Sequence, residues 1–167
     1  MHNRVFEIRE GRPFSEEELK YGTIDENEFL NADGCYADYI IPSEYGREND
    51  LKFLDEIPFG VLTRDGDKLT FSQTNYEAYV ADYVARIKEQ AASLTPGNFY
   101  PAKASELQRW LKFQPDYMDT WVCCKTEEEG WYQFMPIHEF LMYVGEYLTN
   151  EDESPVLFIG KAWDYHW

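Results

Sequence analysis

The clearest hydrophobic pattern in the chain lies between residues 57 and 94, where a turn signal precedes an amphipathic stretch. Short apolar runs flank Asp65 and Gly66, and Asp-Gly favours a type I′ turn because both residues tolerate positive φ. Thr74 and Glu77 then fit a capping box. Apolar residues follow at helical spacing: Tyr76, Tyr79, Val80, Tyr83, Val84, Ile87, Ala91 and Leu94. The pattern predicts a hairpin and then a helix, which the hairpin is expected to cover.

A second hairpin followed by a helix is predicted over residues 120–148. Strand-like runs at 121–124 and 131–135 flank a glutamate-rich loop that ends in Gly130. After Pro136, apolar residues recur at helical spacing: Ile137, Phe140, Leu141, Val144 and Leu148. The two units share a supersecondary pattern and no residue-level repeat.

The remaining predicted elements are short. They are a strand at 4–9, a helix that a Ser15–Glu18 capping box begins and Gly22 ends, a strand at 36–41, helical turns at 50–54 with Leu51 and Leu54 inward, a helix at 104–113 and a strand at 155–160. Together they predict an α+β fold: an antiparallel sheet of two β-hairpins plus edge strands, with about three helices packed on one face. We expect one compact domain over residues 1–167, with a sub-lobe boundary near 96–101 as the alternative.

Length and composition agree with a cytoplasmic protein. A chain of 167 residues buries roughly 70% of its unfolded surface, which is enough for a core without disulfide staples. No apolar run approaches the roughly 20 residues that span a bilayer, and the first residues lack a hydrophobic signal region. Three cysteines with one adjacent pair make a poor disulfide framework, so we expect a reducing compartment.

Charge is the strongest compositional signal, with a net value of −17. Residues 1–58 carry −9, residues 59–118 carry zero and residues 119–167 carry −8. Direct binding to nucleic acid and to anionic membranes is disfavoured, because both need a surplus of lysine and arginine. The charge favours a basic protein partner, or serves solubility alone.

No catalytic motif stands out. The chain contains no phosphate loop, nucleophile elbow, zinc spacing or dinucleotide fingerprint, so we expect no metal and no cofactor. The acids between residues 25 and 38 do not fit a calcium loop. A thiol nucleophile built from Cys123 or Cys124 with His138 is one alternative, although a buried cysteine is more commonly a small apolar residue. A pair of the many carboxylates is another route to an enzyme.

The last third of the chain combines acids with aromatic residues, which suits a surface that binds a basic protein. The candidate contact residues are Glu127, Glu128, Glu129, Trp131, Trp163, Asp164 and Tyr165. The segment from Trp163 to Trp167 either packs on its own domain or meets a partner. We therefore expect a non-enzymatic interaction protein, such as an inhibitor, an immunity-type protein or a nucleic-acid mimic. A small enzyme with a carboxylate- or cysteine-based site, and a homo-oligomeric ligand-binding or structural domain, are the alternatives; the oligomeric state is left open.

Overall fold

The protein is described by a computed structural model that covers residues 2–30, 39–99, 107, 120–125, 132–148 and 155–166. Its strands are β1 (His2–Glu10), β2 (Tyr39–Pro42), β3 (Leu62–Asp65), β4 (Lys68–Phe71), β5 (Thr120–Lys125), β6 (Tyr132–Pro136) and β7 (Val156–His166). Its helices are α1 (Glu16–Tyr21), α2 (Glu26–Leu30), α3 (Arg47–Asp55), α4 (Gln73–Ala92) and α6 (Ile137–Tyr143), with a 3-10 turn η1 (Pro58–Gly60) and a π-helical turn η2 (Val144–Leu148).

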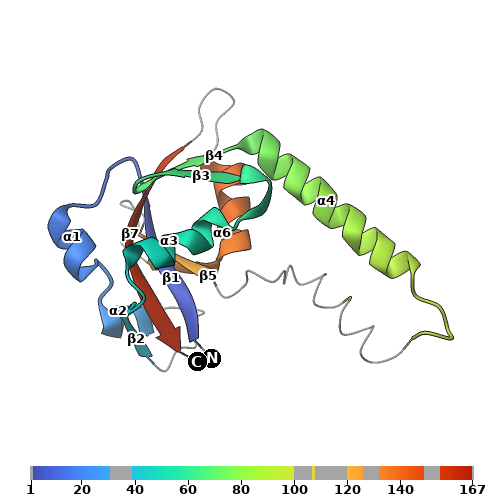
Figure 1. The fold of residues 1–167 in the computed structure, drawn as a ribbon, viewed down its shortest axis with the longest axis horizontal. Coiled ribbons are helices and arrows are strands. Elements are labelled where there is room, and N and C mark those ends of the chain that lie inside the picture. The colour runs from blue at the N-terminus through green and yellow to red at the C-terminus, as the bar shows by residue number, and fades with distance from the viewer. Residues whose placement is uncertain are drawn as a thin grey trace.

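The seven strands form one sheet in the order β3-β4-β7-β1-β5-β6, and β2 pairs with β7 outside this path (Figure 1). Both predicted hairpins are present, as the antiparallel pairs β3–β4 and β5–β6. The predicted α+β class is confirmed. The sheet differs from a purely antiparallel one because β1 and β5 run parallel to each other.

The sheet is covered on both faces, whereas the sequence predicted helices on one. Val5, Phe6, Glu7 and Ile8 are all buried, since β1 lies between β7 and β5 and neither of its faces meets water. One core packs α3, α6 and the start of α4 against Phe6, Ile8, Val122, Cys124, Leu157 and Ile159. The other core packs Ile24 and α2 against Val5, Cys123, Trp163 and Tyr165. The alternation of side chains along each strand distributes its residues between these two cores.

β7 is longer than predicted, because the strand continues past Gly160 to His166. Trp163 lies opposite Val5 and Tyr165 lies opposite Asn3 on β1. Trp163 and Tyr165 therefore belong to a central strand of the domain, which agrees with the self-packing alternative for this part of the segment.

The β3–β4 turn is of a different type from the one predicted. Asp65 and Lys68 pair, so Gly66 and Asp67 form the two-residue loop. Gly66 has a φ of 59° while Asp67 does not have positive φ, which is the pattern of a type II′ turn rather than type I′. The predicted cap of the next helix also shifts: Ser72 caps α4, and its Oγ accepts from the amide of Asn75 at 3.3 Å.

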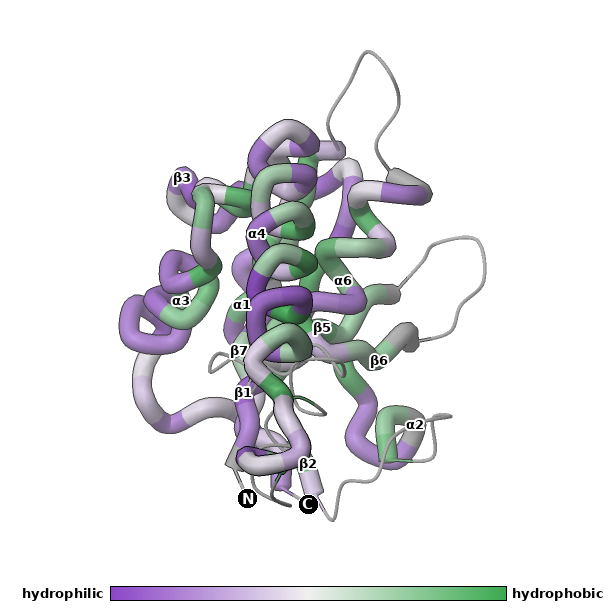
Figure 2. Tube along the Cα trace, turned by 90° about the vertical axis from the view of Figure 1, so that its right-hand side faces the viewer, coloured by the Kyte–Doolittle hydropathy of each residue, from purple (hydrophilic) through white to green (hydrophobic). Residues whose placement is uncertain are grey.

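Helix α4 extends past the edge of the sheet (Figure 1), and its hydrophilic and hydrophobic residues alternate along its length (Figure 2). Of its predicted apolar stripe, Tyr79 and Tyr83 are 3% exposed, while Val84 is 40% exposed. Tyr76 and Val80 pack partly against the first core. None of the helices in the described part of the chain is both long and apolar enough to cross a membrane.

Other local predictions agree with the structure. Ser15 and Glu18 form the predicted capping box of α1, and Gly22 ends the helix with a φ of 80°. Helix α3 is longer than predicted and buries Leu51 and Leu54. The predicted helix at 104–113, the loop at 126–130, Cys35 and residues 100–101 of the alternative boundary lie outside the described residues, apart from position 107.

Candidate functional site

The predicted contact residues fall into two groups. Glu127, Glu128, Glu129 and Trp131 lie outside the described residues. Trp163 and Tyr165 are 7% and 3% exposed and belong to the second core, while Asp164 is half-buried between them. Most of the surface of both aromatic side chains is therefore already covered by the domain itself. The contact surface stays a prediction that depends on the hairpin tip.

The two cysteines point to opposite faces of the sheet, as expected for neighbours on a strand. Cys124 lies in the first core, and its burial raises the pKa of the thiol to about 12. Cys123 lies in the second core. His138 is the second residue of α6, and burial lowers its pKa to about 4. A thiol with such a high pKa stays protonated at neutral pH, which disfavours Cys124 as a nucleophile.

The most elaborate polar site in the described part of the chain surrounds Glu7 on β1, and the sequence did not single it out. Glu7 as a whole residue is 2% exposed. The indole N–H of Trp163 donates to Oε1 at 2.7 Å. The amide of Thr23 donates to Oε1 at 2.9 Å and to Oε2 at 3.1 Å, and the Thr23 hydroxyl lies 2.9 Å from Oε2. A longer contact of 3.4 Å joins the Ile24 amide to Oε1.

Two glycines allow the chain to close around Glu7. A Cβ on Gly22 would lie 2.1 Å from Cζ2 of Trp163 and 2.9 Å from Oε1 of Glu7. A Cβ on Gly160 would lie 2.7 Å from the Phe14 ring and 2.8 Å from Cβ of Glu7. Both positions therefore need glycine for a close approach, and Gly22 needs it also for its positive φ.

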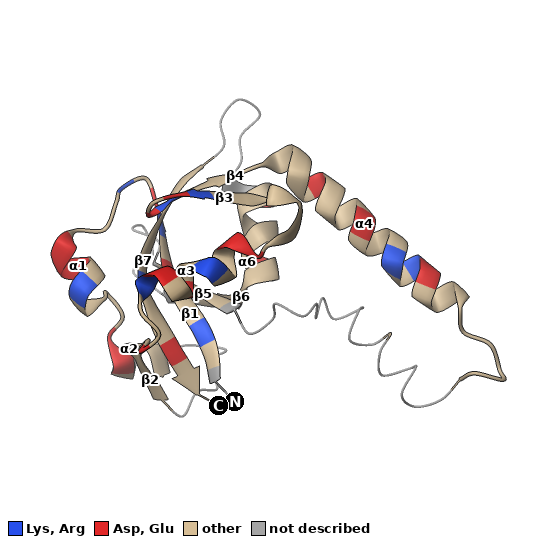
Figure 3. Ribbon diagram, in the orientation of Figure 1, with Lys and Arg blue, Asp and Glu red and all other residues tan. Residues whose placement is uncertain are grey.

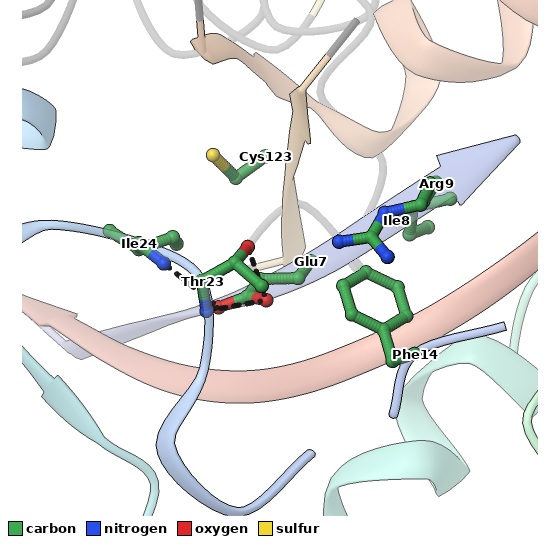
Figure 4. Close-up of a pocket in the computed structure, with 7 residues that line it drawn as sticks. All are labelled: Glu7, Ile8, Arg9, Phe14, Thr23, Ile24 and Cys123. Carbon is green, nitrogen blue, oxygen red and sulfur yellow. Dashed lines mark hydrogen bonds between the residues drawn. The ribbon is translucent and has the colours of Figure 1, made fainter. Parts of the chain in front are cut away.

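A small cavity lies beside the carboxylate (Figure 4), lined by Glu7, Ile8, Arg9, Phe14, Thr23, Ile24 and Cys123. Its volume of about 10 Å³ is the room that one water molecule needs. Arg9 is directed elsewhere, because its guanidinium donates to both oxygens of Glu18 and lies 4.0 Å from the centroid of the Phe14 ring. Burial raises the pKa of Glu7 above its usual range, against the opposing effect of its hydrogen bonds.

This arrangement holds a carboxylate in place and is too small for an organic substrate. Among the residues that the structure describes, no three histidine, cysteine or carboxylate side chains form a group suited to a metal ion. The signal that could have indicated the site is the single acid in the apolar run Val5-Phe-Glu-Ile8. Its partners Thr23 and Trp163 are too distant in sequence for any local pattern to reveal.

Each arginine of the described ranges forms an ion pair with a carboxylate of the same domain. The pairs are Arg4–Asp50, Arg9–Glu18, Arg12–Glu18, Arg47–Asp67, Arg64–Asp55 and Arg86–Asp82. Exposed acids remain in addition to these, among them Glu16 and Glu17 on α1 and Glu26 on α2 (Figure 3). The acidic excess therefore lies at the surface, while the guanidinium groups are engaged internally.

Comparison with models of known protein families, with curated protein sequences and with solved structures found no match to this chain.

Proposed function

We propose that the protein is a non-enzymatic interaction protein whose acidic surface binds a basic protein partner. The observation that carries the proposal is the pairing of all the described arginines with carboxylates of the same domain. Because carboxylates of the same domain neutralise these guanidinium groups, the remaining acids are available at the surface for a partner. Complementary potential of this kind steers encounter with an oppositely charged partner and suppresses like-charged ones.

An enzymatic role has less support from the described residues. The thiol of Cys124 has its pKa raised to about 12, and the cavity beside Cys123 has room for about one water molecule. A homo-oligomer has to bring two copies of net charge −17 together, which like-charge repulsion opposes.

The proposal is tested by capture from lysate at low and high salt, with three variants of equal charge change. E127Q/E128Q removes two charges from the predicted hairpin tip, E17Q/E26Q removes one charge each from α1 and α2, and E77Q/E89Q on α4 is the matched control. We expect one stoichiometric basic protein, released by salt and weakened by one of the first two variants but retained by the control. Salt screens exposed charges beyond about 10 Å at ~0.1 M, so release by salt identifies an ionic contact.

Equal weakening by all three variants indicates bulk charge rather than a defined surface. Absence of any stoichiometric basic protein at low salt contradicts the proposal. In that case the enzyme and oligomer alternatives are tested next, by ligand screening and by measurement of molar mass in solution.

A further inference from the structure

The turn that joins α1 to α2 is held against the centre of the sheet by hydrogen bonds to one carboxylate. Glu7 on β1 accepts hydrogen bonds from the amides of Thr23 and Ile24 in this turn and from the indole N–H of Trp163 on β7. Gly22 lies directly against the Trp163 ring. The turn between α1 and α2 thus contacts the sheet at the carboxyl group of Glu7, which can gain or lose a proton.

Among the described residues, no lysine or arginine forms an ion pair with Glu7. The charged or titratable groups on the elements packed around it are Arg9 on β1, Glu18 on α1, Cys123 on β5 and Lys161 on β7. Arg9 is bound by Glu18, and Lys161 donates to the carbonyl of Lys20 and lies over the Trp163 ring. An ionised Glu7 is therefore buried with hydrogen bonds but without a counter-ion from the described part of the chain, which is costly in a low-dielectric site.

The hydrogen bonds also allow Glu7 to be protonated at one defined atom, Oε2. The N–H groups of Thr23, Ile24 and Trp163 can only donate, and all three reach Oε1. The Thr23 amide also lies 3.1 Å from Oε2. The Thr23 hydroxyl, 2.9 Å from Oε2, can rotate from donor to acceptor. A proton taken from solvent onto Oε2 therefore gains an acceptor in Thr23 Oγ1, while the three donors to Oε1 keep theirs.

We propose that Glu7 couples proton binding to the docking of the Gly22–Ile24 turn on the sheet. Proton uptake at Oε2 strengthens this docking, and proton release weakens it. When the turn is released, water reaches the carboxylate and its ionised form is no longer penalised. Docking therefore favours the protonated form, and by linkage protonation favours docking. The raised pKa of Glu7 agrees with this direction.

The test is hydrogen exchange of the Thr23 and Ile24 amides in the full chain from about pH 8 down to about pH 5, corrected for the intrinsic exchange rate. In the wild type we expect the protection factors of both amides to rise several-fold as the pH falls. In E7Q, which cannot titrate, we expect a flat profile. E10Q, the same change at an exposed position of β1, is the matched control and should follow the wild type.

A second measurement needs no folded E7Q variant. The carboxyl carbon of Glu7 is titrated by NMR in the wild type and in Thr23→Val, which keeps the shape of the side chain but removes the hydroxyl that donates to Oε2. We expect the wild-type midpoint to lie above 4.5, the ordinary pKa of a glutamate, and the midpoint in Thr23→Val to move further upward, because the lost hydrogen bond stabilises the ionised form. A wild-type midpoint at or below 4.5 overturns the proposal, as does a protection profile that E7Q shares with the wild type.

Discussion

The indole N–H of Trp163 donates a 2.7 Å hydrogen bond to Oε1 of Glu7, joining two residues 156 positions apart in the sequence. The bond lies across the two central strands, β1 and β7, on the face that α2 and the preceding turn cover. It gives a buried tryptophan its polar partner and gives a buried carboxylate one of its donors. The second core is thereby built around a polar contact rather than on apolar packing alone.

Replacement of Trp163 by Phe tests this contact. Loss of the indole donor is expected to cost about 1–3 kcal/mol of unfolding free energy, because Glu7 is left with an unfilled acceptor site. The measurement is urea unfolding. The control is a double-mutant cycle with Glu7→Leu, which removes the acceptor, and the coupling between the two positions should exceed ~0.5 kcal/mol. Additive effects would show that the bond contributes nothing.

Gly22→Ala is expected to be among the most damaging alanine substitutions in the chain. The new methyl group would lie 2.1 Å from the Trp163 ring, in a backbone with a φ of 80°. Backbone strain and overpacking together should cost about 3 kcal/mol or more. Gly66→Ala is the control, because Gly66 also has positive φ but has open space around its Cβ position. Equal losses in the two variants would contradict the close approach to Trp163.

The ion pairs should differ in their contributions according to burial. Nε of Arg4 lies 2.6 Å from Oδ1 of Asp50, with side chains 14% and 3% exposed. Arg4→Met leaves the Asp50 carboxylate buried with only the Ser43 hydroxyl as partner and should cost about 3 kcal/mol. Arg86→Met breaks the exposed pair with Asp82 and should cost less than ~0.5 kcal/mol. Denaturant unfolding of both variants makes the comparison, and similar losses would refute it.

His138 should make the fold sensitive to acid. Its pKa is lowered by burial from 6.5 to about 4, so between these values the unfolded chain binds more protons than the folded one. The contribution of His138 to stability is therefore complete above the unfolded value and is lost as the pH falls toward about 4. Urea unfolding at several pH values should show this slope, and His138→Gln should reduce it. An NMR midpoint of His138 near its ordinary value would contradict the prediction.

The buried cysteines should be inert in the native protein. Burial holds the Cys124 thiol protonated, with a pKa of about 12, and Cys123 is 3% exposed. In a Cys35→Ser variant, a thiol reagent at about pH 8 should modify neither residue until the protein is unfolded. Fast modification of the native variant would restore the cysteine-based site as a candidate.

Local chemistry explains which predictions agree with the structure. The capping box at Ser15, the termination at Gly22, the two hairpins and the inward Leu51 and Leu54 each depend on residues a few positions apart. The predicted cap at Thr74 is wrong: Ser72 caps α4, because Ser72 follows the last residue of β4 directly and its Oγ accepts from the Asn75 amide.

Pairing between distant segments was decided by the tertiary structure alone. Whether Val5 or Phe6 faced the core had no answer in the sequence, because the two cores on opposite faces of the sheet bury both. The same strand pairing brings Glu7, Thr23 and Trp163 together. It also places Trp163 and Tyr165, which the sequence suggested as contact residues, in the second core. The sequence by itself determined the two hairpins, helices α1, α3, α4 and α6, the α+β class and the acidic charge, since these follow from local propensity and composition. The Glu7 site required the strand register, because the hydrogen bonds that define it connect residues up to 156 positions apart.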